Sequence, residues 1–393
     1  MKKAKENQKT SSRKRTAGKK VPDGKHTPSR KGTTGSISRT AGPLTLTQAR
    51  ALVLAQETIP KHTPRRSLAG SVQSAFQSST TAIETASIGK VGNERRKLRL
   101  KRRQETRERI RDYTATLTLL KQRGVKGLSY KAVRRRAPGA TAVAAPSSQP
   151  LQILAEGDSW FDYPPFLLSG GIIPRLESRI GVPILNIAKA GDEVRYMLGV
   201  EERALLAEHL KQGCPAGGPW DALLFSGGGN DIIDNPMALW IKDYNSTLPA
   251  SSHIHQQRFN AVLNLVRAGY EDLIIIRDTL SPSTHIFFHT YDFAIPDGRG
   301  VCFLGPWLKP TFDLRGFKTR TSAFEVVKEM LKQFADMLQT LVSPTVTLIN
   351  TQATLSPQTS SWHNELHPSK EGFEKFADIF HQKLKTQFPG RVL

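Results

Sequence analysis

The sequence predicts an α/β fold with three layers, in which a five-stranded parallel sheet lies between two layers of helices. Two observations predict it. In residues 150–393, short apolar runs alternate with longer segments of helical periodicity, which is typical of β-α-β units and a parallel sheet. Residues 1–149 show no such alternation and are strongly basic, so we expect a largely disordered, partly helical arm ahead of the α/β part.

The basic charge of the chain is concentrated in this arm. Residues 1–149 hold 35 Lys and Arg against 8 Asp and Glu, whereas residues 150–393 hold 22 against 26. The formal net charge of +23 and the pI near 10.1 therefore describe the arm and not the near-neutral α/β part. An arm of this kind is either a solvated tail or a nonspecific polyanion binder, with nucleic acid or an anionic membrane surface as its partner.

Two helices are expected in the arm. The first covers Thr45–Thr58, and the second covers residues 93–123. The second helix begins with a dense run of Lys and Arg, but later apolar residues recur at helical spacing: Ile110, Tyr113, Leu117 and Leu120. We expect this apolar face to pack either on the α/β part or on a second copy of the chain. An Ala/Pro/Ser linker at residues 137–150 follows, so we expect the arm and the α/β part to be separable.

Several classes of protein are excluded by composition. Cys214 and Cys302 are the only cysteines, so no disulfide framework is indicated. No apolar core of a signal peptide follows the basic N-terminus, and no run approaches the ~18 apolar residues of a membrane helix. We therefore expect a cytoplasmic protein without an integral membrane segment, and export by a signal-independent route is left open.

The α/β part supplies the elements of the expected sheet in order. The apolar runs expected to form strands are Leu151–Ala155, Ile184–Ile187, Ala222–Phe225, Ile286–His289 and Val346–Ile349. The segments expected to form helices are Ile172–Arg179, Val194–Leu210, His255–Leu280 (either continuous or with a break), Ser322–Leu341 and Lys370–Thr386. The carboxyl ends of parallel strands share one edge of the sheet, where ligands of open α/β sheets bind.

Four short polar motifs fall at this edge. They are Gly157-Asp158-Ser159-Trp160, Asn186 to Gly191, Gly228-Gly229-Asn230-Asp231, and Asn364-Glu365-Leu366-His367. The first three follow predicted strands, and the fourth precedes the last helix. Together they contain a nucleophile, a base and donors for an oxyanion, which is the set that acyl transfer needs.

Each motif has an expected role in that chemistry. A serine hydroxyl is a poor nucleophile until a base takes its proton, so Ser159 is the expected nucleophile and His367 its base. Asn364 can hold the imidazole through its amide oxygen, although it supplies no charge. The expected oxyanion donors are the backbone N–H groups of Ser159 and Gly191 and the side-chain amide of Asn230.

The four motifs resemble the sequence blocks of the SGNH, or GDSL-type, hydrolases. The resemblance covers residues 151 to about 385 and leaves the arm outside. It implies the flavodoxin-like fold of that family, a serine hydrolase acting on esters, and no cofactor. The chain departs from the pattern at Asn364, where the family usually has Asp. The residues of its first and last motifs suggest a bacterial subgroup with Asn at this position.

Further residues are candidates for the pocket or for supplying the missing charge. Asp158, Trp160, Asp231, His289 and Asp292 lie at or near predicted strand ends, where side chains either line a pocket or only hydrogen-bond within the fold. A carboxylate that compensates for Asn364 could come from Glu365, Asp162 or Asp292.

A metal site is not expected. His363 and His367 have the i, i+4 spacing of a zinc helix, but the Glu that normally follows the first His is replaced by Asn364. Pro368 would also break a helix at this point.

The sequence therefore predicts a serine esterase or lipase-type hydrolase acting on a small-molecule, carbohydrate or lipid ester. Two alternatives stay open. The first is a silent, hydrolase-like binding protein that its arm docks to a polyanion, and the second is an exported lipase effector.

Overall fold

The computed structural model describes residues 42–57, 88–126, 149–164, 170–301 and 304–393. All of these described residues belong to one compact unit. Most of the basic N-terminal stretch, most of the expected linker at 137–150, and Cys302 lie outside the described residues.

A five-stranded parallel sheet forms the centre of the described fold, which confirms the expected fold class. The strand order is β2-β1-β3-β4-β5, and all four strand pairs are parallel. The strands are β1 (Ile153–Gly157), β2 (Ile184–Asn186), β3 (Ala222–Ser226), β4 (His285–His289) and β5 (Val346–Ile349). Every residue of β1, β3 and β4 is buried, as expected of strands covered on both faces.

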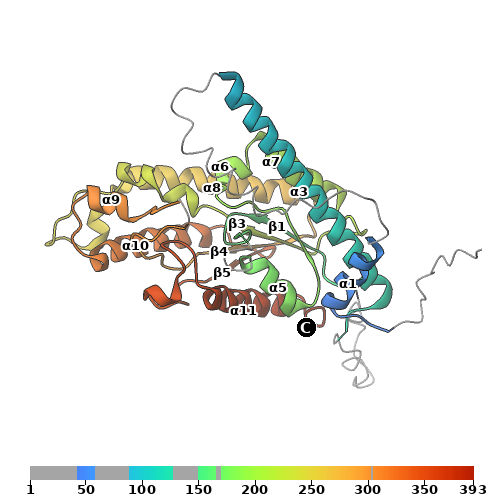
Figure 1. Cartoon of the computed structure of the whole chain (residues 1–393). Helices are drawn as coiled ribbons and strands as arrows, with labels where there is room; N and C mark the ends of the chain where they lie inside the picture. Colours follow the sequence, from blue (N-terminus) through green and yellow to red (C-terminus); the bar gives the residue numbers. More distant parts are fainter. Residues whose placement is uncertain (1–41, 58–87, 127–148, 165–169, 302–303) are drawn as a thin grey trace, which may run out of the picture. The chain divides into compact units, whose positions relative to one another are not determined.

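Helices cover both faces of this sheet (Figure 1). On one side α5 (Ile172–Ile180) packs along α11 (Lys370–Gln387). On the other, α8 (Gln256–Leu280) contacts α6 (Val194–Met197), α7 (Val200–Gln212) and α10 (Arg320–Gln339). Short helices complete the connections: η2 (Asn230–Ile232), η3 (Asn235–Leu239), η4 (Ala250–His253), α9 (Lys309–Leu314) and η5 (Thr359–Ser361).

One helix expectation was wrong, and the structure decides a second that was left open. The single helix expected over Val194–Leu210 is divided into α6 and α7, because Gly199 takes an extended conformation between them. Of the two alternatives for His255–Leu280, the continuous helix is the one observed, as α8. Gly269 lies inside that helix and makes room for α6, since a Cβ there would lie 2.3 Å from a methyl group of Val194.

The two helices expected in the arm are present as α1 (Leu46–Glu57) and α3 (Ile88–Arg123), and they contact each other. Leu117 and Leu120 of α3 have no exposed surface. The Tyr113 ring lies 5.9 Å from the ring of Trp220. The apolar face of α3 therefore packs on the α/β part, which was one of its two expected partners. That the arm and residues 150–393 are separable stays a prediction, and the burial of this face indicates that residues 150–393 are less stable without α3.

The order of the strands determines where a ligand can bind. The chain runs from β1 to its neighbour β2, and then crosses back to β3 on the other side of β1. In open α/β sheets, ligands bind at the carboxyl ends of the two strands where the order reverses. These strands are β1, which leads to Ser159, and β3, which leads to Asn230. None of the described helices is long and apolar enough to cross a membrane.

Candidate active site

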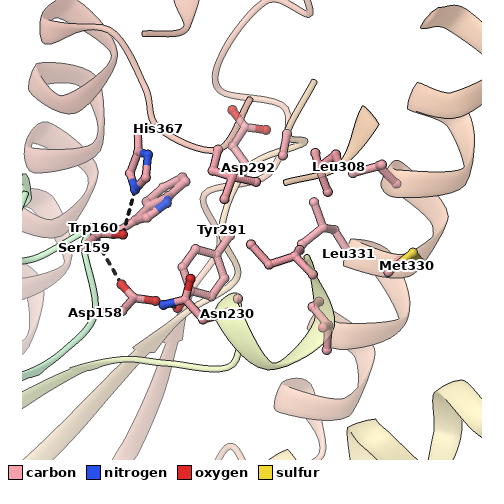
Figure 2. Close-up of a pocket in the computed structure, with 16 residues that line it drawn as sticks. Asp158, Ser159, Trp160, Asn230, Tyr291, Asp292, Leu308, Met330, Leu331 and His367 are labelled. Carbon is pink, nitrogen blue, oxygen red and sulfur yellow. Dashed lines mark hydrogen bonds between the residues drawn. The ribbon is translucent and has the colours of Figure 1, made fainter. Parts of the chain in front are cut away.

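Ser159 and His367 meet at the carboxyl end of β1. The Ser159 hydroxyl lies 2.7 Å from Nε2 of His367 (Figure 2), and the two residues are only 8% and 7% exposed. Ser159 stands on the turn that follows β1. His367 stands in the loop before α11, and this helix is capped by Ser369, whose hydroxyl accepts from the Gly372 N–H at 3.1 Å. The expected nucleophile and base are therefore in hydrogen-bond contact without any ligand.

Asn364 holds the other side of the imidazole. Its Oδ1 lies 3.0 Å from Nδ1 of His367 and accepts the backbone N–H groups of Leu366 and His367, each at 2.9 Å. Backbone N–H groups can only donate, so this atom of the amide is the oxygen. Nδ1 must then carry the proton, and Nε2 is left with the lone pair that accepts the serine proton. Asn364 thus selects the tautomer that a base needs.

The three carboxylates considered as substitutes for the missing charge are engaged elsewhere. Glu365 accepts four backbone N–H groups, those of Gly298, Trp307, Leu308 and Lys309. Asp292 accepts the N–H groups of Phe293, Ala353 and Leu355, and Asp162 pairs with Arg109. Glu365 and Asp292 therefore hold loops in place, and Asp162 holds α3. None of the three carboxylates is hydrogen-bonded to His367.

The expected oxyanion donors lie at the ends of the first three strands. Nδ2 of Asn230 donates to the Asp192 carbonyl at 2.9 Å, which fixes the amide, and its second N–H has no acceptor among the described residues. Within the described part of the chain, the backbone N–H groups of Ser159 and Gly191 donate to no residue. Gly191 has φ +83°, a conformation that favours glycine, and open space where a Cβ would stand.

Asp231 and Asp158 connect these motifs to one another. Asp231 accepts the Val194 N–H at 2.9 Å, so the third motif holds the segment that follows Gly191. Asp158 accepts the Trp160 N–H at 3.0 Å and the Ser226 hydroxyl at 2.8 Å. Burial raises the pKa of both carboxyl groups to about 6.

His289 belongs to this buried framework rather than to the pocket. Its Nε2 lies 2.8 Å from the Ser226 hydroxyl, and the residue has no exposed surface. Burial lowers its pKa to about 3, so the ring is neutral at physiological pH. It therefore matches the alternative of a hydrogen-bonded residue at a strand end.

A narrow apolar cavity of about 40 Å³ opens beside Ser159. Figure 2 shows Asp158, Ser159, Trp160, Asn230, Asp292 and His367 around it. Its far wall is apolar and is formed by Ile232, Ile233, Ala294, Leu308, Val327, Met330, Leu331 and Leu366. Gly191, Asp231 and His289 are not among its lining residues. Val327, Met330 and Leu331 come from α10, and the sequence did not identify them because their apolar spacing is the same as that of ordinary core positions.

The environment of His367 keeps its imidazole neutral. Burial, with a smaller effect from the charge of His363, lowers its pKa to about 3. The Tyr163 ring lies 4.4 Å from the imidazole, and the Tyr163 hydroxyl accepts from Nδ2 of Asn364 at 3.3 Å. The base is therefore held unprotonated before substrate arrives. His363 and Asn364 donate their N–H groups to the His367 carbonyl in a turn and not in a helix.

Comparisons with known proteins give likenesses of fold. No protein-family model matches the chain, and no curated protein matches it. A lipase from a goat rumen metagenome matches at 18% identity and TM-score 0.37, over 59% of this chain and 96% of that one. An extracellular lipase of Streptomyces rimosus matches at 13% identity and TM-score 0.36, over 59% and 99%. A family 3 carbohydrate esterase of Clostridium thermocellum matches at 15% identity and TM-score 0.36, over 62% and 100%. At these values a likeness assigns no activity to this chain.

Proposed function

We propose that this protein is a serine ester hydrolase that forms an acyl-enzyme on Ser159. The observation that carries the proposal is the continuous hydrogen-bonded series from Ser159 to His367 to Asn364. Its tautomer is fixed, its members are buried, and it lies at the edge of a cavity. The resemblance of the four motifs to SGNH hydrolases supports the same conclusion.

The proposed reaction has two halves. In the first, Nε2 of His367 takes the Ser159 proton as Oγ attacks the ester carbonyl, and the imidazolium then gives that proton to the leaving alcohol. In the second, water attacks the acyl-enzyme, His367 takes a proton from that water, and returns it to Oγ as the acid leaves. The N–H groups of Ser159, Gly191 and Asn230 would stabilise the oxyanion in both halves, each contributing roughly 3 kcal/mol.

The cavity favours a short, apolar acyl group. Most of its lining residues are apolar, with Asp158 and Asp292 as the acidic ones, and its volume of about 40 Å³ is small. An acetyl or similarly short acyl group fits such a space, whereas a long chain would require the α10 side of the wall to move. Among small-molecule, carbohydrate and lipid esters, we therefore propose short-chain esters as the substrate class. The proposal does not specify the alcohol.

A series of p-nitrophenyl esters tests this function. The wild type should hydrolyse the acetate with a higher kcat/KM than the octanoate, and Ser159→Ala and His367→Ala should each lower kcat by orders of magnitude while remaining folded. Full activity of either variant would remove the mechanism. A preference for the octanoate would remove only the short-chain assignment.

The exposed part of α3 supports a separate proposal for the arm. Lys101, Arg102 and Arg103 are exposed ahead of the segment that packs on the sheet. We propose that this end of the helix binds polyanions through phosphate contacts, and that the binding weakens steeply with salt. The test is to measure binding to heparin or DNA between 50 and 200 mM salt. Over this range, about six phosphate contacts should make the affinity fall steeply. Salt-independent binding would contradict it.

A further inference from the structure

Arg109 of α3 contacts the second motif of the candidate active site and the segment that follows the first motif. Its Nη1 donates to the carbonyl of Asn186 at 3.1 Å and to that of Ala188 at 3.3 Å. Its Nη2 donates to Asp162 at 3.0 Å and to Glu105 at 2.7 Å. The side chain is 28% exposed and that of Asp162 is 27% exposed, so the contacts are partly shielded from water. One guanidinium thus links helix α3 to the segments after β1 and β2.

The two carbonyls belong to the segment that carries an expected oxyanion donor. Asn186 ends β2, and Gly191 follows Ala188 by three residues. The same segment is attached to β1 by the Lys189 N–H, which donates to the Gly157 carbonyl at 2.8 Å. Arg109 holds the 186–187 and 188–189 peptide planes through these two carbonyls, so it restricts how the chain approaches Gly191. Asp162, in turn, follows Ser159 by three residues.

The planar fork of arginine is suited to this task. It offers five N–H donors in fixed directions and can hold a carboxylate and two carbonyls together. Lysine could neutralise Asp162 but could not reach all three acceptors in one geometry. The exposed Arg107 on the same helix has no such contact among the described residues, and it provides a matched comparison.

We propose that Arg109 is a positioning residue that sets the place of Gly191 relative to Ser159, so that α3 is part of the catalytic unit. The proposal rests on the proposed ester hydrolase function. Small displacements of a group that stabilises a transition state lower the rate strongly, and loss of one oxyanion donor costs about 100-fold or more. A partial displacement should therefore lower kcat by about tenfold or more. KM should change little, because the cavity wall does not include Arg109.

The test compares Arg109→Ala, Arg109→Lys and Arg107→Ala in the full chain. Arg109→Ala should lower kcat for p-nitrophenyl acetate about tenfold or more with KM nearly unchanged, Arg109→Lys should recover part of that loss, and Arg107→Ala should match the wild type. Circular dichroism checks that each variant is folded. If Arg109→Ala fails to fold, Arg109→Lys and Asp162→Asn give the same comparison with smaller changes.

Amide hydrogen exchange separates failure of this inference from failure of the proposed function. In Arg109→Ala, a peptide covering residues 187–192 should exchange faster than in the wild type, while Arg107→Ala leaves it unchanged. Unchanged exchange and unchanged kcat would overturn the role of Arg109. Faster exchange in a protein whose wild type hydrolyses no ester would support the positioning role but reject the proposed chemistry.

Discussion

Replacement of Asn364 gives the sharpest test of how the base is held. This fully buried side chain accepts three N–H groups through one oxygen, those of Leu366 N, His367 N and His367 Nδ1. A buried donor left without a partner costs about 1–3 kcal/mol. Asn364→Ala should therefore lower the free energy of unfolding by about 3 kcal/mol, and kcat/KM by about 100-fold or more because the imidazole loses its tautomer and orientation.

Asn364→Asp should behave in the opposite way. The same three N–H groups can donate to a carboxylate, and the Tyr163 hydroxyl can rotate to donate to its second oxygen. A negative charge next to His367 favours the imidazolium and raises the pKa of the ring. Activity at neutral pH should be kept or increased. The acidic limb of the kcat/KM profile should move to higher pH than in the wild type.

The assay is hydrolysis of p-nitrophenyl acetate as a function of pH, together with unfolding in urea. Asn260→Ala, at an exposed position on α8, is the matched control and should change neither measurement. Wild-type kcat/KM in Asn364→Ala would refute this account of the base. An acidic limb that does not move in Asn364→Asp would show that residue 364 does not interact with the titrating imidazole.

Three further predictions concern pH, the arm and the cavity. Burial lowers the pKa of His289 to about 3, so the stability that its neutral ring contributes is complete above the ordinary pKa of about 6.5 and is lost as pH falls from there toward 3. In His289→Gln, the free energy of unfolding measured in urea should therefore fall less steeply with decreasing pH, by up to about 1.4 kcal/mol per pH unit. An unchanged slope would contradict this. A chain that starts at Ala145 should aggregate or unfold at a lower temperature than the full chain, because it lacks the buried face of α3. A chain that starts near Asn93 keeps this face and should recover thermal stability. Equal melting temperatures of the two chains would show that residues 150–393 fold alone. Met330→Ala should enlarge the cavity and improve kcat/KM for p-nitrophenyl butyrate relative to the acetate, and an unchanged ratio would place the acyl group elsewhere.

The sequence was most informative where one physical requirement dominates. A strand buried on both faces reads as a continuous apolar run, so Ala222–Phe225 of β3 could be placed to within a residue. The meeting of the candidate site residues could be predicted because parallel strands bring their carboxyl ends together, which places Ser159 near residues far away in the chain. His367 is an example, since it lies more than 200 positions later.

Side-chain partners were not predictable in the same way. Glu365 is next to Asn364 in sequence, yet it faces the loop at residues 298–309 because four N–H groups converge on it there. Arg109 belongs to a helix so rich in basic residues that nothing in the sequence distinguishes it from Arg107 or Arg111. Only the docking of α3 beside β2 reveals its partners.

The central claim is that Ser159 becomes covalently acylated with His367 as its base. Labelling with a fluorophosphonate probe, followed by peptide mass spectrometry, tests it most directly. We predict one adduct per chain, on the peptide that contains Ser159, with labelling abolished in Ser159→Ala and slowed by orders of magnitude in His367→Ala. Equal labelling of Ser159→Ala, or an adduct on another residue of the wild type, would contradict the claim.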